Sequence, residues 1–264
     1  MSSGKKGCEL RWKELGKTTK SCVGFSPGSQ MITDRFEDFA QSLRVFIEQK
    51  YRFQELFLID SSEAIGNVEL ACKSMLDTFA SLYDAVRETP EVDFDFYAHP
   101  LCCAVLAYRN AKHHNKAHGI RSVHRHAQQN ERQDYLLVDF PAGDSEDGAG
   151  FIDHYASWGD FCALLDMPRD QSRLRANARN LVRDRIEADG FERFADQDGV
   201  PIHRVFINMI PIIIGAGSEF ITSLKPHIRV HSVEAEHFVS HFEHVEQANF
   251  SRPKYTELTS SVFG

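Results

Sequence analysis

DRFEDFAQSLRVFIEQKYRFQELFL, residues 34–58, carries apolar side chains every three or four positions. This spacing places them on one face of an α-helix. The members of the face are Phe36, Phe39, Ala40, Leu43, Phe46 and Ile47. Asp34, followed three residues later by Glu37, has the pattern of a helix-capping pair. We therefore predict a long first helix that ends near Leu58, where Asp60-Ser61-Ser62 interrupts it.

Two further helices follow from the next apolar stripes. The second stripe consists of Val68, Ala71, Cys72, Met75, Phe79, Leu82 and Val86. It stops at Thr89-Pro90, because proline disfavours helical backbone in the residue before it. The first and second helices are expected to pair antiparallel. A third helix begins at His99-Pro100 with proline in its first turn, and its buried face consists of Leu101, Ala104, Val105 and Tyr108.

The rest of the chain predicts a mostly helical second part. A strand is expected at residues 135–140, and the Gly/Asp-rich loop 141–150 is taken as a boundary. Helices are expected at residues 158–167, 172–188 and 233–247. The apolar runs within residues 201–224 fit strand or buried helix, and Pro211 in the middle favours a kinked helix.

Together these patterns predict a mainly α fold. We expect a flexible N-terminal arm over residues 1–30 and an N-terminal antiparallel helical bundle over residues 31–140. A mostly helical C-terminal part with possible short β-strands is expected over residues 151–264.

Composition narrows the class of protein. The 264 residues are 42% hydrophobic, which is ample for a core, and carry a formal net charge of -8, which excludes a chain that is basic throughout. The six cysteines have no CxxC spacing, so we read them as reduced thiols in a cytoplasmic protein. The longest apolar run, residues 209–216, is too short to cross a bilayer, so no membrane role is expected.

The run Tyr108-Arg109-Asn110-Ala111-Lys112-His113-His114 ends the third predicted helix and carries the candidate chemistry. Arginine holds a phosphate through a planar fork of donors, and histidine moves protons near neutral pH. His114 lies about 140° from Arg109 on a continuous helix, so pairing them requires the helix to end or loosen before His114. His113 shares a face with Arg109 on a straight helix and is the alternative. A structural alternative is that Arg109 and Asn110 cap the helix C-terminus.

On these residues the chain resembles the HEPN superfamily, whose hallmark is arginine, a polar residue, a short spacer and histidine on a bundle of long antiparallel helices. The resemblance covers about residues 34–130, and its strongest piece is Arg109-Asn110 with His114. It implies a metal-independent endoribonuclease that acts as a dimer, with the motifs of two protomers facing one cleft. Other members of the superfamily bind nucleotides or partner proteins without cleavage.

Two groups of basic residues are candidate RNA contacts. The first group surrounds the motif and consists of Lys112, Lys116, Arg121 and Arg125. The second group, Arg175, Arg179 and Arg183, stands at i, i+4 and i+8 of a predicted helix and would form a cationic stripe. Neighbouring acidic residues can neutralise that stripe, which favours a solvated amphipathic helix over an RNA-binding surface.

His237, His241 and His244 stand at i, i+4 and i+7 of a predicted helix, a spacing that lets imidazoles share a Zn²⁺ ion. They also border an apolar stripe that consists of Phe238, Phe242 and Val245, and this simpler interpretation is preferred. The sequence contains no GxGxxG, GxxxxGK[ST] or GxSxG motif. No cofactor is expected.

The function favoured by the sequence is a metal-independent endoribonuclease, and the resemblance to the HEPN superfamily suggests a toxin or defence effector. His114 would take the proton of a ribose 2′-OH, Arg109 would stabilise the charged transition state, and Asn110 would orient either group. A homodimer with RNA as substrate is expected, and the sequence leaves open whether an antitoxin or other protein partner binds it. The first alternative is a non-catalytic module of the same fold that binds a nucleotide or a protein. The second is a metal-dependent hydrolase built on His237, His241 and His244.

Overall fold

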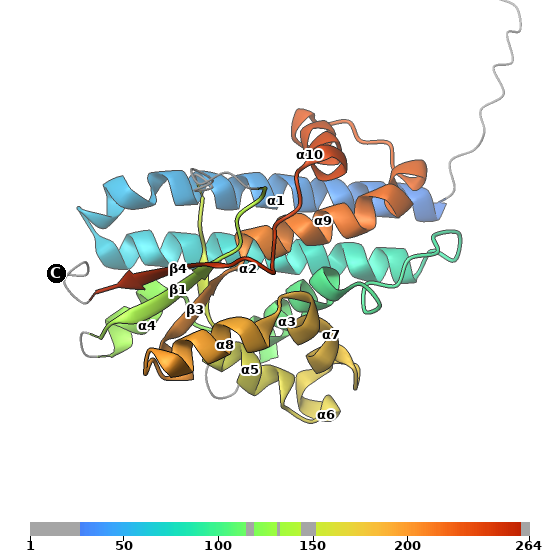
Figure 1. Cartoon of the computed structure of the whole chain (residues 1–264). Helices are drawn as coiled ribbons and strands as arrows, with labels where there is room; N and C mark the ends of the chain where they lie inside the picture. The colour runs from blue at the N-terminus through green and yellow to red at the C-terminus, as the bar shows by residue number, and fades with distance from the viewer. Residues whose placement is uncertain (1–26, 115–118, 131–132, 144–151, 260–264) are drawn as a thin grey trace, which may run out of the picture.

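Two long helices run the length of the molecule (Figure 1). The computed structural model describes residues 27–114, 119–130, 133–143 and 152–259. α1 (Pro27–Phe57) and α2 (Ser61–Arg87) lie side by side, run in opposite directions and are joined by a short turn. The Asp60 carboxylate caps α2 by accepting the Glu63 N–H at 2.9 Å. Both helices expected from the first two apolar stripes are therefore present.

α1 begins at Pro27, more than a turn before the predicted start, so residues 27–30 belong to the helix and not to an N-terminal arm. Proline suits a first turn, where its missing N–H costs nothing. Asp34 and Glu37 lie inside α1, so their interpretation as a capping pair is wrong. Glu37 instead accepts the Ser232 N–H at 3.2 Å and so ties α1 to the C-terminal region.

α3 (Pro100–His114) is the central helix. Every residue from Leu101 to Tyr108 is at most 3% exposed, because the helix packs against α2 on one side and α9 (Ile210–Leu224) on another. Glu219 of α9 satisfies its first backbone donors, accepting the Leu101 N–H at 3.1 Å and the Cys102 N–H at 2.9 Å. A helix buried on all sides has room for charged residues only at its end.

An aromatic cluster joins helices from both parts of the chain. The Phe220 ring of α9 has its centroid 6.2 Å from that of Phe39 on α1 and 6.0 Å from that of Phe79 on α2. α10 (Val233–His244) adds Phe242, whose centroid lies 5.9 Å from that of Phe220. Residues before and after the loop that the sequence analysis takes as a boundary therefore share one core.

One mixed sheet of four strands lies beside the helices. Its strands are β1 (Tyr135–Asp139), β2 (Tyr155–Ser157), β3 (Val205–Asn208) and β4 (Lys254–Leu258), in the order β2-β3-β1-β4. β1 pairs parallel with β3, and the two outer pairings are antiparallel. The predicted strand at residues 135–140 is confirmed, but the sheet is larger than the short strands expected. α4 (Val123–Gln129), which was not predicted, lies beside it and is capped by Ser122.

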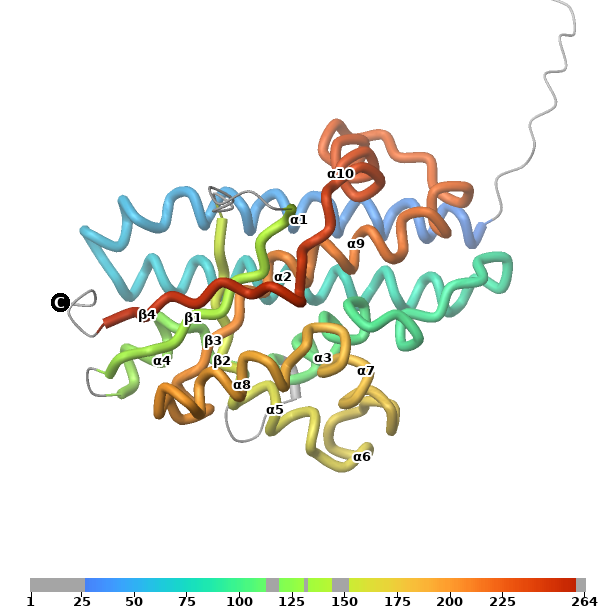
Figure 2. Tube along the Cα trace, in the orientation of Figure 1, coloured from blue at the N-terminus to red at the C-terminus, as the bar shows by residue number. Residues whose placement is uncertain are grey.

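Four short helices lie on the side of α3 that faces away from α1 (Figure 2). They are α5 (Trp158–Leu165), α6 (Arg169–Ser172), α7 (Ala178–Arg185) and α8 (Ala188–Gln197). The first three of them contact α3, and the fourth packs against the third. The prediction of one helix over residues 172–188 is wrong. Arg173 and Glu187 adopt left-handed backbone, with φ of 58° and 51°, and each interrupts the helix. The burial of Leu174, 4% exposed, fixes the first of these turns.

The prediction of a kinked helix over residues 201–224 is also wrong. The segment forms a short turn, η1 (Ile202–Arg204), then strand β3 and then α9, with Pro211 in the first turn of α9. The Asn208 side chain stabilises the turn between β3 and α9, because its Oδ1 accepts the Ile210 N–H at 3.1 Å. A second short turn, η2 (Lys225–His227), connects α9 toward α10, which confirms the last predicted helix.

Within the residues that the structure describes, no helix has the length and apolar character needed to cross a membrane. The described cysteines, Cys72, Cys102, Cys103 and Cys162, are free thiols, and the first three are buried. Burial raises the pKa of the Cys72 thiol to about 11, so it packs as a small neutral group.

We expect Gly217→Ala to destabilise the protein by about 1–3 kcal/mol, because a Cβ at this position of α9 would stand 2.5 Å from the Phe242 ring. Gly66→Ala is the matched control, since nothing lies within 4 Å of its Cβ position in α2. The control should stabilise the helix by about 0.5–1 kcal/mol. Urea unfolding measures both changes, and a shift of the same sign in both variants would contradict the close packing of α9 on α10.

Candidate functional site

After Pro100, Arg109 and Asn110 are the first side chains of α3 to reach solvent. Arg109 is 26% exposed, and its Nε lies 3.4 Å from Asp77 Oδ1 on α2. Asn110 Nδ2 donates to the Ser172 carbonyl oxygen at 3.4 Å. Both residues stand a full turn before the end of α3 and contact other elements, so neither of them caps the helix. The capping alternative is therefore wrong.

Arg109 and Asn110 line a groove between α2, α3 and the segment from α6 to α7, with a volume of about 380 Å³. We call this the arginine groove, and its cationic residues are Arg87, Arg109, Arg169, Arg173 and Arg175. Three ion pairs supply carboxylates to it, and these are Arg109 with Asp77, Arg87 with Asp84 and Arg175 with Asp95. Arg169 adds a further guanidinium group to these three ion-paired arginines, so the concave surface favours an anion.

Two tyrosines form an aromatic wall of the arginine groove. The Tyr83 and Tyr97 rings meet edge to face with centroids 5.6 Å apart. Arg87 lies over Tyr83 at 5.4 Å, and Arg175 lies over Tyr97 at 5.0 Å. Burial, with Tyr83 close by, raises the pKa of Tyr97, so its phenol stays neutral. The groove therefore combines guanidinium forks with flat apolar surfaces.

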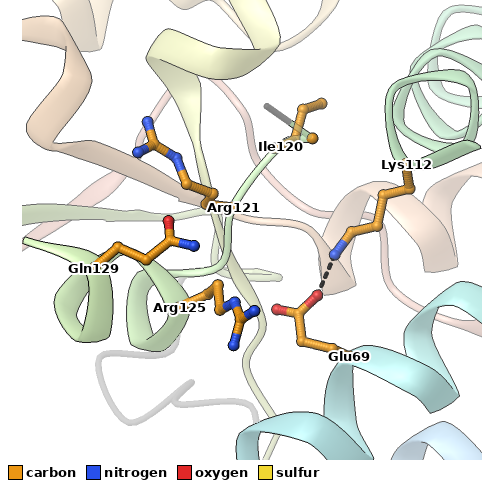
Figure 3. Close-up of a pocket in the computed structure, with 7 residues that line it drawn as sticks. Glu69, Lys112, Ile120, Arg121, Arg125 and Gln129 are labelled. Carbon is orange, nitrogen blue, oxygen red and sulfur yellow. Dashed lines mark hydrogen bonds and ion pairs between the residues drawn. The ribbon is translucent and has the colours of Figure 1, made fainter. Parts of the chain in front are cut away.

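Lys112, Arg121 and Arg125 meet in a second hollow of about 220 Å³ (Figure 3). We call this the basic pocket; Glu69 and Gln129 complete its polar lining. Figure 3 shows Lys112 and Arg125 approaching Glu69 from two sides. The structure thus brings together three of the four basic residues that the sequence placed around the motif. The fourth, Lys116, lies outside the described residues.

Ion pairs hold two of the three cations of the basic pocket. Arg121 donates from Nε and Nη2 to the Asp160 carboxylate, each at 2.8 Å. Lys112 Nζ bonds Glu69 and is 10% exposed. Burial disfavours the charge on both partners, yet their attraction lowers the pKa of Glu69 and helps to raise that of Lys112. Arg125 is exposed, which leaves its guanidinium open to solvent and ligand.

A buried polar network lies behind the basic pocket. Tyr108 Oη and His154 Nε2 are 3.0 Å apart, and Cys72 Sγ lies 3.6 Å from the same nitrogen. Burial, reinforced by Lys50, lowers the pKa of His154 to about 3, so the imidazole is neutral. A neutral His154 positions Tyr108 next to the motif but has no contact with solvent at either hollow.

α3 remains helical through His114. The loosening of the helix that a pairing of Arg109 with His114 requires is therefore not found. On this backbone, position 113 lies about 40° around the helix from position 109, between the positions of Arg109 and Asn110. Position 114 is turned about 140° from position 109. The side chains of His113 and His114 are outside the described part of the structure.

Arg175, Arg179 and Arg183 do not form one stripe, because the helix that would carry them is interrupted. Arg175 reaches the arginine groove, whereas Arg179 pairs with Asp166 at 2.8 Å on the outer surface. Arg183 bonds Glu192 at 2.7 Å and lies over the Trp158 ring at 5.9 Å. The Glu192 hydrogen bonds raise the pKa of Arg183, which is a structural cation.

His237, His241 and His244 lie along α10 without converging on a point. The His237 and His241 rings stack with centroids 6.2 Å apart, and His244 Nδ1 bonds the Ser240 carbonyl at 2.7 Å. Across the described ranges, no three or more His, Cys, Asp or Glu side chains are placed to hold a metal ion. These positions therefore give no ligand set for the metal-dependent hydrolase.

The sequence analysis missed Arg87, Tyr83 and Tyr97 as lining residues of the arginine groove. Arg87 and Tyr83 lie in the last turns of α2, and Tyr97 lies in the connection from α2 to α3. A cation in the last turn of a helix is common for electrostatic reasons alone. No spacing rule connects these residues with Arg109, because α2 and α3 meet only through tertiary packing.

Comparison of the chain with known protein families, curated proteins and solved structures gives no match.

The free energy of unfolding should fall as the pH drops below about 6.5. Burial lowers the pKa of His154 to about 3 and that of His124 to about 4 in the folded protein, whereas both bind a proton near pH 6.5 when unfolded. Between these values the unfolded state binds more protons, so acid favours it, by up to about 1.4 kcal/mol per pH unit for each histidine. Urea unfolding from pH 7 to pH 4.5 measures this slope, and His154→Gln should reduce it. A slope that is the same in the variant would contradict a neutral buried His154.

Proposed function

We propose that the protein is a metal-independent endoribonuclease that holds the phosphate backbone of RNA in the arginine groove and cleaves it beside Arg109. The observation that carries this proposal is the presence of Arg109, Asn110 and Arg175 in one positively charged groove. The sequence had marked these residues separately, two as catalytic and one as RNA-binding. The presence of all three side chains in one groove favours a phosphate ligand.

The lining of the groove suits a single-stranded ligand. Arginine forks bind phosphate oxygens in two-point contacts, and the Tyr83 and Tyr97 rings, each with an arginine over one face, give the groove aromatic surface that a base can contact. The acidic net charge of -8 restricts binding to such local patches. We therefore propose unpaired RNA as the substrate.

The proposed reaction needs a phosphate clamp and a proton acceptor. Arg109 would hold the scissile phosphate and stabilise the charge that grows on its oxygens. A histidine at the end of α3 would take the proton of the 2′-OH as that oxygen bonds to phosphorus. The bond to the 5′ oxygen then breaks, and this oxygen takes up a proton from water. The products are a 2′,3′-cyclic phosphate and a 5′-hydroxyl, and DNA is not cut because it lacks the 2′-OH.

We assign the proton acceptor to His113 in preference to His114. α3 is helical through both residues, and position 113 lies next to Arg109 on the surface of the helix. Histidine is a suitable proton acceptor because its ordinary pKa lies close to neutral pH. Asn110, at the adjoining position, would orient the phosphate.

One contact favours a second candidate function, the binding of a phosphorylated ligand without cleavage. Arg109 is held by Asp77 at 3.4 Å, which is the arrangement expected of a binding residue whose charge is balanced when no ligand is present. In this alternative a nucleotide or a phosphorylated protein replaces the carboxylate at Arg109. The homodimer expected from the sequence is retained as part of both proposals, and whether an antitoxin or other protein partner binds it stays open.

Arg109→Gln and His113→Asn should each abolish RNA cleavage, because one removes the phosphate clamp and the other the proton acceptor. The loss should be about 10²-fold or more for each variant. His114→Asn is the matched control and should keep activity within a few-fold of the parent. Cleavage of a labelled single-stranded RNA in the presence of EDTA measures all three rates.

Two outcomes of that assay would contradict the assignments. Equal loss of activity in His113→Asn and His114→Asn would show that the position of a histidine around α3 does not determine which one accepts the proton. Full activity in Arg109→Gln would remove the endoribonuclease proposal, and activity abolished by EDTA would contradict metal independence. Because the Arg109 side chain is 26% exposed, Arg109→Gln is expected to fold. Circular dichroism of each variant tests whether unfolding causes the loss of activity.

Asp77→Asn should tighten RNA binding about 3- to 10-fold at low salt, because it frees Arg109 from its ion pair and removes a negative charge beside the groove. Asp38→Asn changes the same charge on an exposed residue of α1 that pairs with Arg35 and should have no such effect. Fluorescence anisotropy with a non-cleavable 2′-O-methyl RNA measures both affinities. Equal changes in the two variants would show a general charge effect and contradict a site at Arg109.

A further inference from the structure

We infer that the arginine groove and the basic pocket are the two ends of one RNA-binding path, with Arg109 between them. The inference rests on the proposed function and extends it by stating how much of the substrate the protein contacts. The observation behind it is that one helix, α2, borders both hollows and also carries the partner of Arg109.

α2 places three points of the path in order. Glu69 lines the basic pocket, Asp77 pairs with Arg109, and Arg87 lines the far end of the arginine groove. At about 100° per residue, Glu69 and Arg87 point in the same direction from the helix, and Asp77 is turned from them by about 80°. At about 1.5 Å of rise per residue, Glu69 and Arg87 are roughly 27 Å apart along the axis. The three points therefore follow one side of the helix.

The charges along this line fit a chain of phosphates better than a single anion. The basic pocket offers the exposed Arg125, while Lys112 and Arg121 have their charges balanced by Glu69 and Asp160. The arginine groove adds Arg169 to the ion-paired Arg87, Arg109 and Arg175. A small anion would occupy one hollow and leave the other hollow without a role. A strand that crosses Arg109 would use both.

The length of the path sets the number of nucleotides. At about 3.4 Å per stacked nucleotide, a span of roughly 27 Å takes about eight nucleotides, and an extended strand covers it with fewer. Single-strand sites of OB-fold proteins take about 4–16 nucleotides. The path is therefore expected to bind between four and eight nucleotides, with the scissile phosphate at an internal position near Arg109.

A length series tests this inference. Non-cleavable 2′-O-methyl oligouridylates of two to twelve nucleotides are titrated against the full chain by fluorescence anisotropy. Affinity should rise with length and level off between four and eight nucleotides. Arg125→Gln and Arg87→Gln, which remove a cation from opposite ends, should each shorten the length at which affinity levels off. Each should also weaken binding of the twelve-nucleotide RNA by about 3- to 10-fold.

Arg35→Gln is the control, because Arg35 is an exposed arginine inside α1 that pairs with Asp38. The path is overturned if affinity levels off at two or three nucleotides, or if Arg125→Gln and Arg35→Gln give the same length series. Either result leaves the proposed function intact, provided that RNA still binds at the arginine groove. Absence of binding at every length contradicts the proposed function as well as the path.

Discussion

The burial of residues 101–108 of α3 is the constraint on which the candidate site depends. From Leu101 to Tyr108 the helix is at most 3% exposed, and Glu219 holds its first backbone donors from the neighbouring helix α9. Such a helix cannot rotate or slide without leaving buried donors unsatisfied and opening cavities. Its last turn, which begins near Arg109, therefore emerges at a fixed point between α2 and the α6–α7 segment. Packing in the core thus determines where the polar residues of the motif reach solvent.

Charge compensation gives the two hollows different characters. In the basic pocket, Lys112 and Arg121 are balanced by Glu69 and Asp160, so these pairs fix the wall, and the exposed Arg125 remains open to a ligand. In the arginine groove, Arg87, Arg109 and Arg175 are paired with carboxylates, and Arg169 adds a further guanidinium group. Exposed ion pairs such as Arg87 with Asp84 are weak and screened by salt, so a phosphate can displace their carboxylates at low energetic cost. The arginine groove is therefore the better candidate for the reaction site, and the basic pocket is an extension of it.

The sequence predicted local secondary structure well, but it predicted poorly which residues from distant segments lie together. The apolar stripes of α1 and α2, the start of α3 at Pro100 and the strand near Tyr135 were all found, because each depends on residues close together in the chain. The helix over residues 172–188 failed because the left-handed turn at Arg173 follows from the burial of Leu174 against distant residues. For the same reason, the sequence marked Arg109 and Arg175 without indicating that they share a groove. Arg87, Tyr83 and Tyr97 carry no local signal at all.

The most direct test of the central claim is to locate bound RNA on the protein. A single-stranded RNA that carries 4-thiouridine is irradiated with the full chain, and the cross-linked peptides are identified by mass spectrometry. The account predicts cross-links to Tyr83 or Tyr97 and to the segment 169–175, and their loss in Arg109→Gln. Cross-links confined to α10 or to the exposed face of α1, unchanged in that variant, would contradict an RNA site in the arginine groove.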